Sequence, residues 1–470
     1  MTDAVLFVLF LQVIGCIPLA ALNGRRHGLL TVALSLPVGC AIWILCALAL
    51  LTLRIQLGPV STGIVSACLS LAFLPFARRR IGMIHVAIIL TGLLLIASLP
   101  RFVTTMAWTT DSLFMVLMGE DILREGSLSP VISDWYLTSY PLAVPLLAIQ
   151  GLASDPPRLP LVLTVLPVSL TLLVINAATP AHCRHRILAA IAAIAAMATI
   201  FLSAQGAMQA IYVNGHVLTA CLIVGFFSVP EGEPRLSSCI RTLLAAGVVV
   251  CRAEGILIAI LMLTLEPMPV SSPWRRLLPT TVVALVATFS LGFVAFNPAA
   301  VPDILTPRLA WMLIAIGWIN VLIILAVYGF DEGWLFQKMT VLTLAAGIGL
   351  SILLFVFKPV HMALVAYNIG CNMLFGGGWG IVWPAVLFAV IVVARSHRSA
   401  MLEDKRIVFA ASYLLLLFCL GALYDRPYTI GPYDSGNRLL LHALPLLVGA
   451  LIAHAMSLPK VQLATNRKNV

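Results

Sequence analysis

The sequence predicts an all-α fold: a polytopic membrane protein with a bundle of about 13–15 transmembrane helices. Apolar residues fill 61% of the 470 positions, charged residues fill only 10%, and the mean hydropathy is +1.07. Soluble domains are about 45–50% apolar and about 25% charged, so this chain has too few charges to cover a water-exposed surface. The long, continuous apolar runs also exclude a β-barrel, because barrel strands alternate between apolar and polar residues.

The net charge of +10 does not indicate nucleic-acid binding, because the basic residues fall in short clusters between apolar runs. Such clusters are topology signals of membrane proteins. The ten cysteines predict no disulfide framework, since nine lie in apolar spans or expected inner loops and only Cys371 falls in an expected outer loop. We therefore expect membrane lipids around the chain and no nucleic-acid partner.

The spans follow from length, because about 20 apolar residues at 1.5 Å each cross the hydrocarbon core of about 30 Å. A shorter pair of apolar runs, 240–251 and 255–267, is interrupted by Arg252-Ala253-Glu254-Gly255. This pair is either two half-helices that meet at depth or one long helix with a charged middle. The other spans are predicted over 4–22, 29–53, 58–77, 82–100, 158–178, 187–204, 209–229, 277–297, 309–328, 340–357, 380–395, 407–424 and 438–456.

The placement of basic residues predicts the orientation. When the short pair counts as two spans, 19 of the 28 Lys and Arg residues fall on one side, which the positive-inside rule makes the cytoplasmic side. The N-terminus is then outside and the C-terminus inside. The long connections, 101–157, 298–308, 358–379 and 425–437, all open outward, so any chemistry is expected at that face.

The chain has no soluble domain or internal repeat, and we divide it by its spans. Residues 1–81 hold three helices that form a candidate N-terminal addition, residues 82–456 form the core, and residues 457–470 form a cytoplasmic tail.

The first outer loop contains an expected amphipathic helix along the membrane surface. Apolar residues recur at helical spacing at 113, 114, 117, 118, 122 and 123, and Gly126 is a typical C-cap. Thr110 is a typical N-cap, and Asp111 lies in the first turn, where a carboxylate suits the helix dipole. Asp111 is therefore either a capping residue or a base at the mouth of a membrane cavity.

Further along the same loop, an acid stands among aromatic residues. Asp134 and Trp135 precede Tyr140-Pro141-Leu142. Aromatic rings stack on the C–H faces of sugars while a carboxylate binds hydroxyls, so this segment suits a sugar. The alternative is an interfacial belt, which also collects Trp and Tyr.

Arg252 and Glu254 are the most costly ionisable residues in the spans, at about 2.5–3.5 kcal/mol each for a mid-bilayer position. They are expected to face a cavity or each other. Either they only neutralise one another, or Arg252 contacts an anionic ligand that Glu254 helps to orient.

The last outer loop ends in Gly436-Asn437-Arg438. Arg438 is predicted to open a helix, where a guanidinium beside unpaired amides makes a phosphate site; snorkelling to the interface is the alternative. His442 lies one turn further on the same predicted face, and alone it would more often be a buried, hydrogen-bonded core residue.

Residues 358–379 form another expected outer loop that holds Lys358 and His361. The run Gly376-Gly377-Gly378 suggests a mobile segment that could act as a lid. No Walker lysine follows it, so it is not a phosphate loop. No local cluster has the spacing of a zinc site, and we predict no metal ligands.

Taken together, Asp111 after a core span, a Gly-terminated surface helix, a Tyr-Pro-Leu turn and the closing Gly-Asn-Arg-Leu-Leu-Leu-His-Ala-Leu-Pro resemble the GT-C superfamily of integral-membrane glycosyltransferases. The Arg252–Gly255 break lies where the lipid A aminoarabinose and protein O-mannosyl transferases carry a charged residue and a glycine. The similarity covers about residues 82–456. The chain departs from the family pattern in several respects. Ser112 follows Asp111, where the protein O-mannosyl transferases have an Asp-Glu pair, and Tyr140-Pro141-Leu142 stands where Pro-Pro-Leu is usual. Three helices also precede the usual first core span.

The resemblance implies an inverting transfer of a sugar from a polyprenyl-phosphate donor to a hydroxyl of a lipid, glycan or protein acceptor. Asp111 would be the general base. Arg438, with Arg252 or Lys358, would hold the donor phosphate, while Glu254 and Asp134 bind sugar or acceptor hydroxyls beside Trp135, Tyr140 and His442. Some members need a divalent cation, which the sequence leaves open. We expect a bacterial inner (plasma) membrane protein with its active site facing the periplasm.

Two alternative functions remain. A transporter or flippase of an amphiphilic, lipid-linked anion would use the same arginine and glutamate without a base. Transporters, however, tend to show internal repeats and midplane polar residues in both halves, whereas the polar residues here gather at one face. A surface-glycan polymerase or ligase is the other alternative, and acceptor size would distinguish it.

Overall fold

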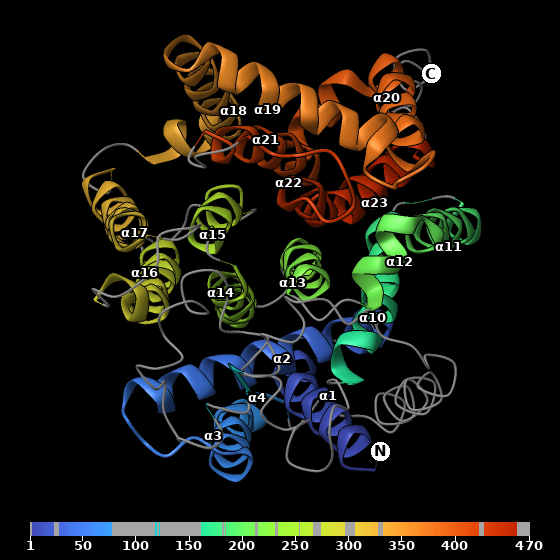
Figure 1. Ribbon diagram of the computed structural model, residues 1–470. Coiled ribbons are helices and arrows are strands. Elements are labelled where there is room, and N and C mark those ends of the chain that lie inside the picture. The colour runs from blue at the N-terminus through green and yellow to red at the C-terminus, as the bar shows by residue number, and fades with distance from the viewer. Residues whose placement is uncertain are drawn as a thin grey trace. The chain divides into compact units, whose positions relative to one another are not determined.

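In the computed structural model, every regular element of the described residues is a helix (Figure 1). Six of these helices are long and apolar enough to cross a membrane, or seven if one bent pair counts as a single span. The chain is therefore a polytopic helical membrane protein. The structure describes residues 2–22, 28–77, 118, 119, 122, 161–180, 183, 185–211, 215–230, 234–252, 254–266, 274–296, 306–327, 332–422 and 427–457.

The chain forms two compact units. Unit 1 comprises Met1–Leu173 and Met208–Met339, and unit 2 comprises Val174–Ala207 and Thr340–Val470. Three helices run from the residues of one unit into those of the other: α10 (Leu161–Ala178), α12 (Ala204–Ile211) and α18 (Glu332–Phe357). The first three spans pack within unit 1. The division at residues 81 and 456 expected from the spans stays a prediction.

Unit 1 begins with a tightly packed group of helices, α1 (Thr2–Leu22), α2 (Gly28–Thr52), α3 (Pro59–Leu71) and α4 (Leu74–Ala77). α1 and α2 approach closely because glycines stand at their crossing. A Cβ on Gly15 would lie 1.9 Å from the carbonyl oxygen of Ser35, and one on Gly39 would lie 1.9 Å from that of Leu11. Small residues allow such approach between membrane helices, where packing rather than hydrophobicity drives association.

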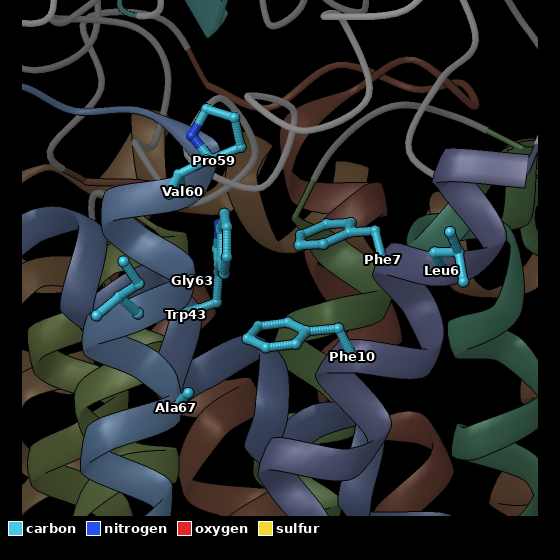
Figure 2. Close-up of a pocket in the computed structure, with 9 residues that line it drawn as sticks. Leu6, Phe7, Phe10, Trp43, Pro59, Val60, Gly63 and Ala67 are labelled. Atoms are coloured by element: carbon cyan, nitrogen blue, oxygen red, sulfur yellow. The ribbon is translucent and has the colours of Figure 1, made fainter.

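An apolar groove of about 510 Å³ lies among these first helices (Figure 2). Its central side chain is Trp43 of α2, which meets the ring of Phe7 edge-on with the ring centroids 4.8 Å apart. Phe10 lies 6.1 Å from the same indole in a similar geometry. The remaining lining residues come from α1 and from the region where α3 begins: Leu6, Pro59, Val60, Gly63, Ile64 and Ala67.

Further along unit 1, several helices pack against α2, which is almost entirely buried. α13 (His216–Ser228) and α14 (Pro234–Cys251) contact α2, and α15 (Gly255–Thr264) follows α14. α16 (Trp274–Ala295) and α17 (Pro307–Val327) lie side by side (Figure 1). Trp318 of α17 donates a hydrogen bond of 3.0 Å to the hydroxyl of Thr288 in α16.

Unit 2 is built on α11 (Arg186–Leu202) and the C-terminal helices. The chain bends by 87° between α11 and α12. After α18 come α19 (Pro359–Cys371) and a π-helical turn (Asn372–Gly376), then α20 (Val382–Glu403) and α21 (Lys405–Leu420). The chain then forms α22 (Ser435–Leu439), a 3₁₀ turn (Leu440–His442) and α23 (Leu444–Ala455).

A half-buried carboxylate, Asp404, is the N-cap of α21. Asp404 accepts hydrogen bonds from the backbone and side chain of Arg406 and, at 3.0 Å, from His454 of α23. Arg406 also donates to the carbonyl of Ala177 near the end of α10, at 2.9 Å. Burial raises the pKa of Asp404, but the hydrogen bonds from His454 and Arg406 and the charge of Arg406 outweigh it. The pKa therefore lies well below its usual range.

The structure confirms a helix at each predicted span that it describes, while 82–100 lies outside the described residues. The number of crossings stays a prediction. The prediction of a loop over 358–379 is wrong, because most of this segment forms α19 and the π-helical turn. Its helical run of 13 residues is too short to span a membrane, so length alone did not reveal it.

Candidate functional site

A charged helix break lies within unit 1 between α14 and α15. α15 turns back along α14. The two approach so closely that a Cβ on Gly255 would lie 2.2 Å from the carbonyl oxygen of Val248. Beyond the end of α15, Glu266 reaches back to Arg241 of α14 at 3.3 Å. The single long helix is thereby excluded. The two helices form a hairpin, and we call residues 252–255 the hairpin tip.

The two charges of the hairpin tip face each other, which is one of the two arrangements that the sequence left open. Arg252 Nε donates to Glu254 Oε1 at 2.9 Å. The Arg252 side chain is 16% exposed and that of Glu254 is 7% exposed. The guanidinium thus keeps some access to the surroundings while the carboxylate balances its charge.

His216 is a third member of this cluster that the sequence analysis did not select. It is the first residue of α13, is buried, and has its Nε2 3.5 Å from Nη1 of Arg252. A guanidinium can only donate, so Nε2 is the acceptor in this contact. An ionisable residue at the start of an apolar span, here Gly215-His216, is a signal that could have identified it.

The hairpin tip can bind a ligand that carries both an anion and hydroxyl groups. Arg252 offers a planar, permanently charged donor set that suits phosphate. Glu254 holds that guanidinium in place and offers carboxylate oxygens that accept from hydroxyls.

The second ion pair of the hairpin is sealed. The side chains of Arg241 and Glu266 are 3% and 2% exposed. Arg241 Nη2 also donates to the carbonyl of Val229 at 2.7 Å, where α13 ends. This pair joins the ends of α13 and α15 to α14 and has no exposed face for a ligand.

In unit 2, the run of glycines from Gly376 to Gly380, here called the glycine turn, is packed rather than free to act as a lid. A Cβ on Gly377 would lie 2.6 Å from Oδ1 of Asn437, and one on Gly376 would lie 2.2 Å from Ile430. Gly378 has φ +77°, a conformation that favours glycine. Close packing at Gly376 and Gly377 and the left-handed backbone of Gly378 therefore explain why glycine stands at these positions. The segment that was predicted to be mobile is close-packed at these glycines.

Amide side chains fix the glycine turn to the loop before α22. Asn437 accepts from the indole N–H of Trp379 at 2.6 Å and donates to the carbonyl oxygens of Gly377 and Gly431. Asn372 donates to the carbonyl of Thr429 at 2.8 Å and accepts from the N–H of Gly431 at 2.9 Å. Both amides are thus committed to structure.

Arg438 does not open a helix, and that part of the prediction is wrong. α22 begins at Ser435, and its N-cap is Asp434, whose carboxylate accepts from the N–H of Asn437. Arg438 lies in the last turn of this five-residue helix and is half-buried. Its guanidinium remains a candidate for phosphate, without help from a helix N-terminus.

His442 and Lys358 both have protein partners. His442 is fully buried in the 3₁₀ turn, not on a continuation of α22, and its Nδ1 lies 2.8 Å from the hydroxyl of Tyr413. Lys358 precedes α19 and donates to the carbonyl of Ala422 at 2.9 Å, while His361 lies 2.8 Å from that of Gly421. A cation at the end of α21 suits the helix dipole.

Four predicted site residues, Asp111, Asp134, Trp135 and Tyr140, lie outside the described residues. In the expected surface helix, Met118, Gly119 and Ile122 are described; they are helical, and the two apolar side chains are buried. The structure brings Arg252 and Glu254 together in unit 1, while Arg438, His442 and Lys358 belong to unit 2. Within the described ranges, no group of three His, Cys, Asp or Glu side chains could hold a metal ion.

The fold and these clusters define an all-helical membrane protein with a charged, partly exposed hairpin tip in one unit and a polar glycine turn in the other. No protein-family model, curated protein or solved structure matches the chain.

Proposed function

We propose that the protein is an inverting glycosyltransferase that moves a sugar from a polyprenyl-phosphate donor to an acceptor hydroxyl at the extracytoplasmic membrane face. The observation that carries this proposal is the hairpin tip, where a partly exposed Arg252 is held by Glu254. Charged residues within membrane helices are costly and are retained for function. A cation paired with a carboxylate suits a donor with both a phosphate and sugar hydroxyls.

In the proposed reaction, Asp111 takes the proton from the acceptor hydroxyl. The oxygen of that hydroxyl bonds to the anomeric carbon as the bond from this carbon to the phosphate oxygen breaks. Polyprenyl phosphate leaves with the electron pair, and the configuration inverts.

Cations stabilise the charge that develops on the leaving phosphate. The candidate for this positive charge in unit 1 is Arg252, and the candidates in unit 2 are Arg438 and Lys358. Glu254 and Asp134 are the candidates that bind hydroxyls. The donor's hydrocarbon tail requires a lipid environment, which accounts for a chain built almost wholly of apolar helices.

The test is mass spectrometry of lipids after the reconstituted full-length protein meets a panel of polyprenyl-phosphate sugars and acceptor lipids. The wild type is expected to release free polyprenyl phosphate from one donor, and the Asp111→Asn variant is expected to release none. Glu120→Gln, on the polar side of the same expected helix, serves as a matched control with unchanged release. Equal release by wild type and Asp111→Asn would remove Asp111 from the mechanism.

A flippase of lipid-linked sugars is the second candidate, because the structure contains two broken helical segments, the hairpin of α14 and α15 and the 87° bend between α11 and α12. Discontinuous helices at charged sites are typical of transporters. In the same vesicles, a flippase would move the lipid-linked sugar between leaflets and release no polyprenyl phosphate.

A further inference from the structure

Gln205 is a buried amide near the start of α12 in unit 2. Its side chain is fully covered, and among the described residues neither its Nε2 nor its Oε1 has a hydrogen-bond partner. Burying an amide without partners is unfavourable, because the water it loses is not replaced. The folded protein would be more stable with an apolar side chain of similar size at this position, so stability does not explain the presence of the amide.

The backbone places Gln205 beside the glycine turn. Its N–H donates to the carbonyl of Gly378 at 3.0 Å. The neighbouring carbonyl of Gly377 accepts from Asn437 at 2.8 Å, and Arg438 follows Asn437 in the chain. The glycine turn therefore connects Gln205 to the arginine that is a candidate for the donor phosphate.

The contrast with other amides nearby is informative. Asn372 and Asn437 use both their donor and their acceptor atoms on the protein itself. Where a buried amide of this cluster has a structural role, its donor and acceptor atoms are thus hydrogen-bonded within the protein. Gln205 retains an unused acceptor and an unused donor group side by side.

We propose that Gln205 binds two neighbouring hydroxyls of the sugar carried by the donor, and this inference rests on the proposed function. One hydroxyl donates to Oε1 while the next accepts from Nε2, so a vicinal diol matches the amide at both atoms. A phosphate group could use only Nε2. Because Gln205 is fully covered, binding requires that its surroundings open locally.

The experiment compares two classes of lipid on purified full-length protein: bare polyprenyl phosphate, and polyprenyl phosphate linked to glucose, mannose, galactose or arabinose. We expect the wild type to bind one sugar-bearing lipid more tightly than the bare lipid. The Gln205→Leu variant should keep the affinity for bare lipid and lose about three- to ten-fold in affinity for the sugar-bearing one. Its thermal midpoint should equal or exceed that of the wild type, because an unpaired buried amide is gone.

Ser412→Ala is the matched control. Ser412 of α21 is also buried, and its hydroxyl also lacks a partner within the described part of the chain. Its removal should affect stability alone and leave both affinities unchanged. Gln205→Met keeps the length and flexibility of the side chain, and serves if the leucine variant does not fold.

The outcomes separate the two proposals. If the wild type prefers a sugar-bearing lipid and the Gln205 variants keep that preference in full, this inference is overturned while the proposed function stands. An equal loss for bare and sugar-bearing lipids would also overturn it, since it would indicate a structural role. If the wild type prefers no sugar in the panel, the proposed function fails and this inference fails with it.

Discussion

Two arginine–glutamate pairs in one helical hairpin differ in what they can reach. Arg241 pairs with Glu266 and bonds to the carbonyl that ends α13, whereas Arg252 pairs with Glu254 and contacts the residue that starts α13. Both pairs therefore tie the same three helices together. The first pair is almost completely covered, while the Arg252 side chain keeps 16% of its surface exposed.

This difference separates structure from function better than residue type does. A sealed ion pair gains little net stability, because the attraction repays a large desolvation cost, yet the loss of one partner leaves a charge in the interior. A pair with one exposed member can exchange part of its contacts for a ligand. We therefore expect changes at Arg241 to affect folding first and changes at Arg252 to affect binding first.

The largest expected effect is on the sealed pair. Arg241→Met removes the guanidinium from Glu266 and should lower the free energy of unfolding by about 3–5 kcal/mol. Unfolding of the detergent-solubilised protein in denaturant measures it.

The double variant Arg241→Met/Glu266→Leu tests the cause of that loss. Because it removes both charges, it should recover most of the stability. A double variant as unstable as the single one would show that lost packing, not an unpaired charge, dominates at this site.

Asp404 extends the comparison to a half-buried carboxylate in unit 2 that accepts hydrogen bonds from several donors. Asp404→Asn should cost about 1.5–3 kcal/mol, since hydrogen bonds to a charged group are lost. The lowered pKa determines how the free energy of unfolding changes with pH. The stability that Asp404 contributes is fully present above the unfolded pKa of about 3.9 and is lost as pH falls toward the folded value. Unfolding measured from pH 7 to pH 3 should therefore show the gap between wild type and Asp404→Asn narrowing below about pH 4.

A gap that stays constant down to pH 3 would contradict this account of Asp404. The carboxylate would then contribute through the shape of its cap at the start of α21 and not through its charge.

At the hairpin tip, the effect should appear in binding. Arg252→Gln should raise the KM for a sugar-bearing polyprenyl phosphate by about 10- to 100-fold, which corresponds to the loss of a charged hydrogen bond to phosphate. Its unfolding free energy should change less than that of Arg241→Met. The opposite ranking, with Arg252 more important for folding than for turnover, would assign the tip a structural role.

The sequence alone was enough to predict features that depend on the length of an apolar run and on the energetic cost of a charge within it. Apolar runs long enough to cross a membrane predicted the helices. Arg252-Ala253-Glu254-Gly255 marked an interruption, because charges and glycine are unfavourable within an apolar helix. The sequence left open whether this interruption separates two half-helices or lies within one long helix, and only the contact of Glu266 with Arg241 decides between them.

Features that depend on distant partners could not be predicted in the same way. The three glycines suggested mobility, but Asn437, about 60 residues further along, packs against Gly377. His216 lies 36 residues before Arg252, and only the fold brings them together. For Arg438 a local signal existed, because Asp434-Ser435 is a typical helix start three residues earlier.

The smallest expected effect belongs to His216. Its contact with Arg252 is long, at 3.5 Å, while Glu254 holds the same guanidinium at 2.9 Å. His216→Gln keeps an acceptor in the side chain and should therefore raise the KM by no more than about threefold. A rise of about tenfold or more would mean that His216 is as important as Glu254 in positioning Arg252, which would extend the functional part of the hairpin to the start of α13.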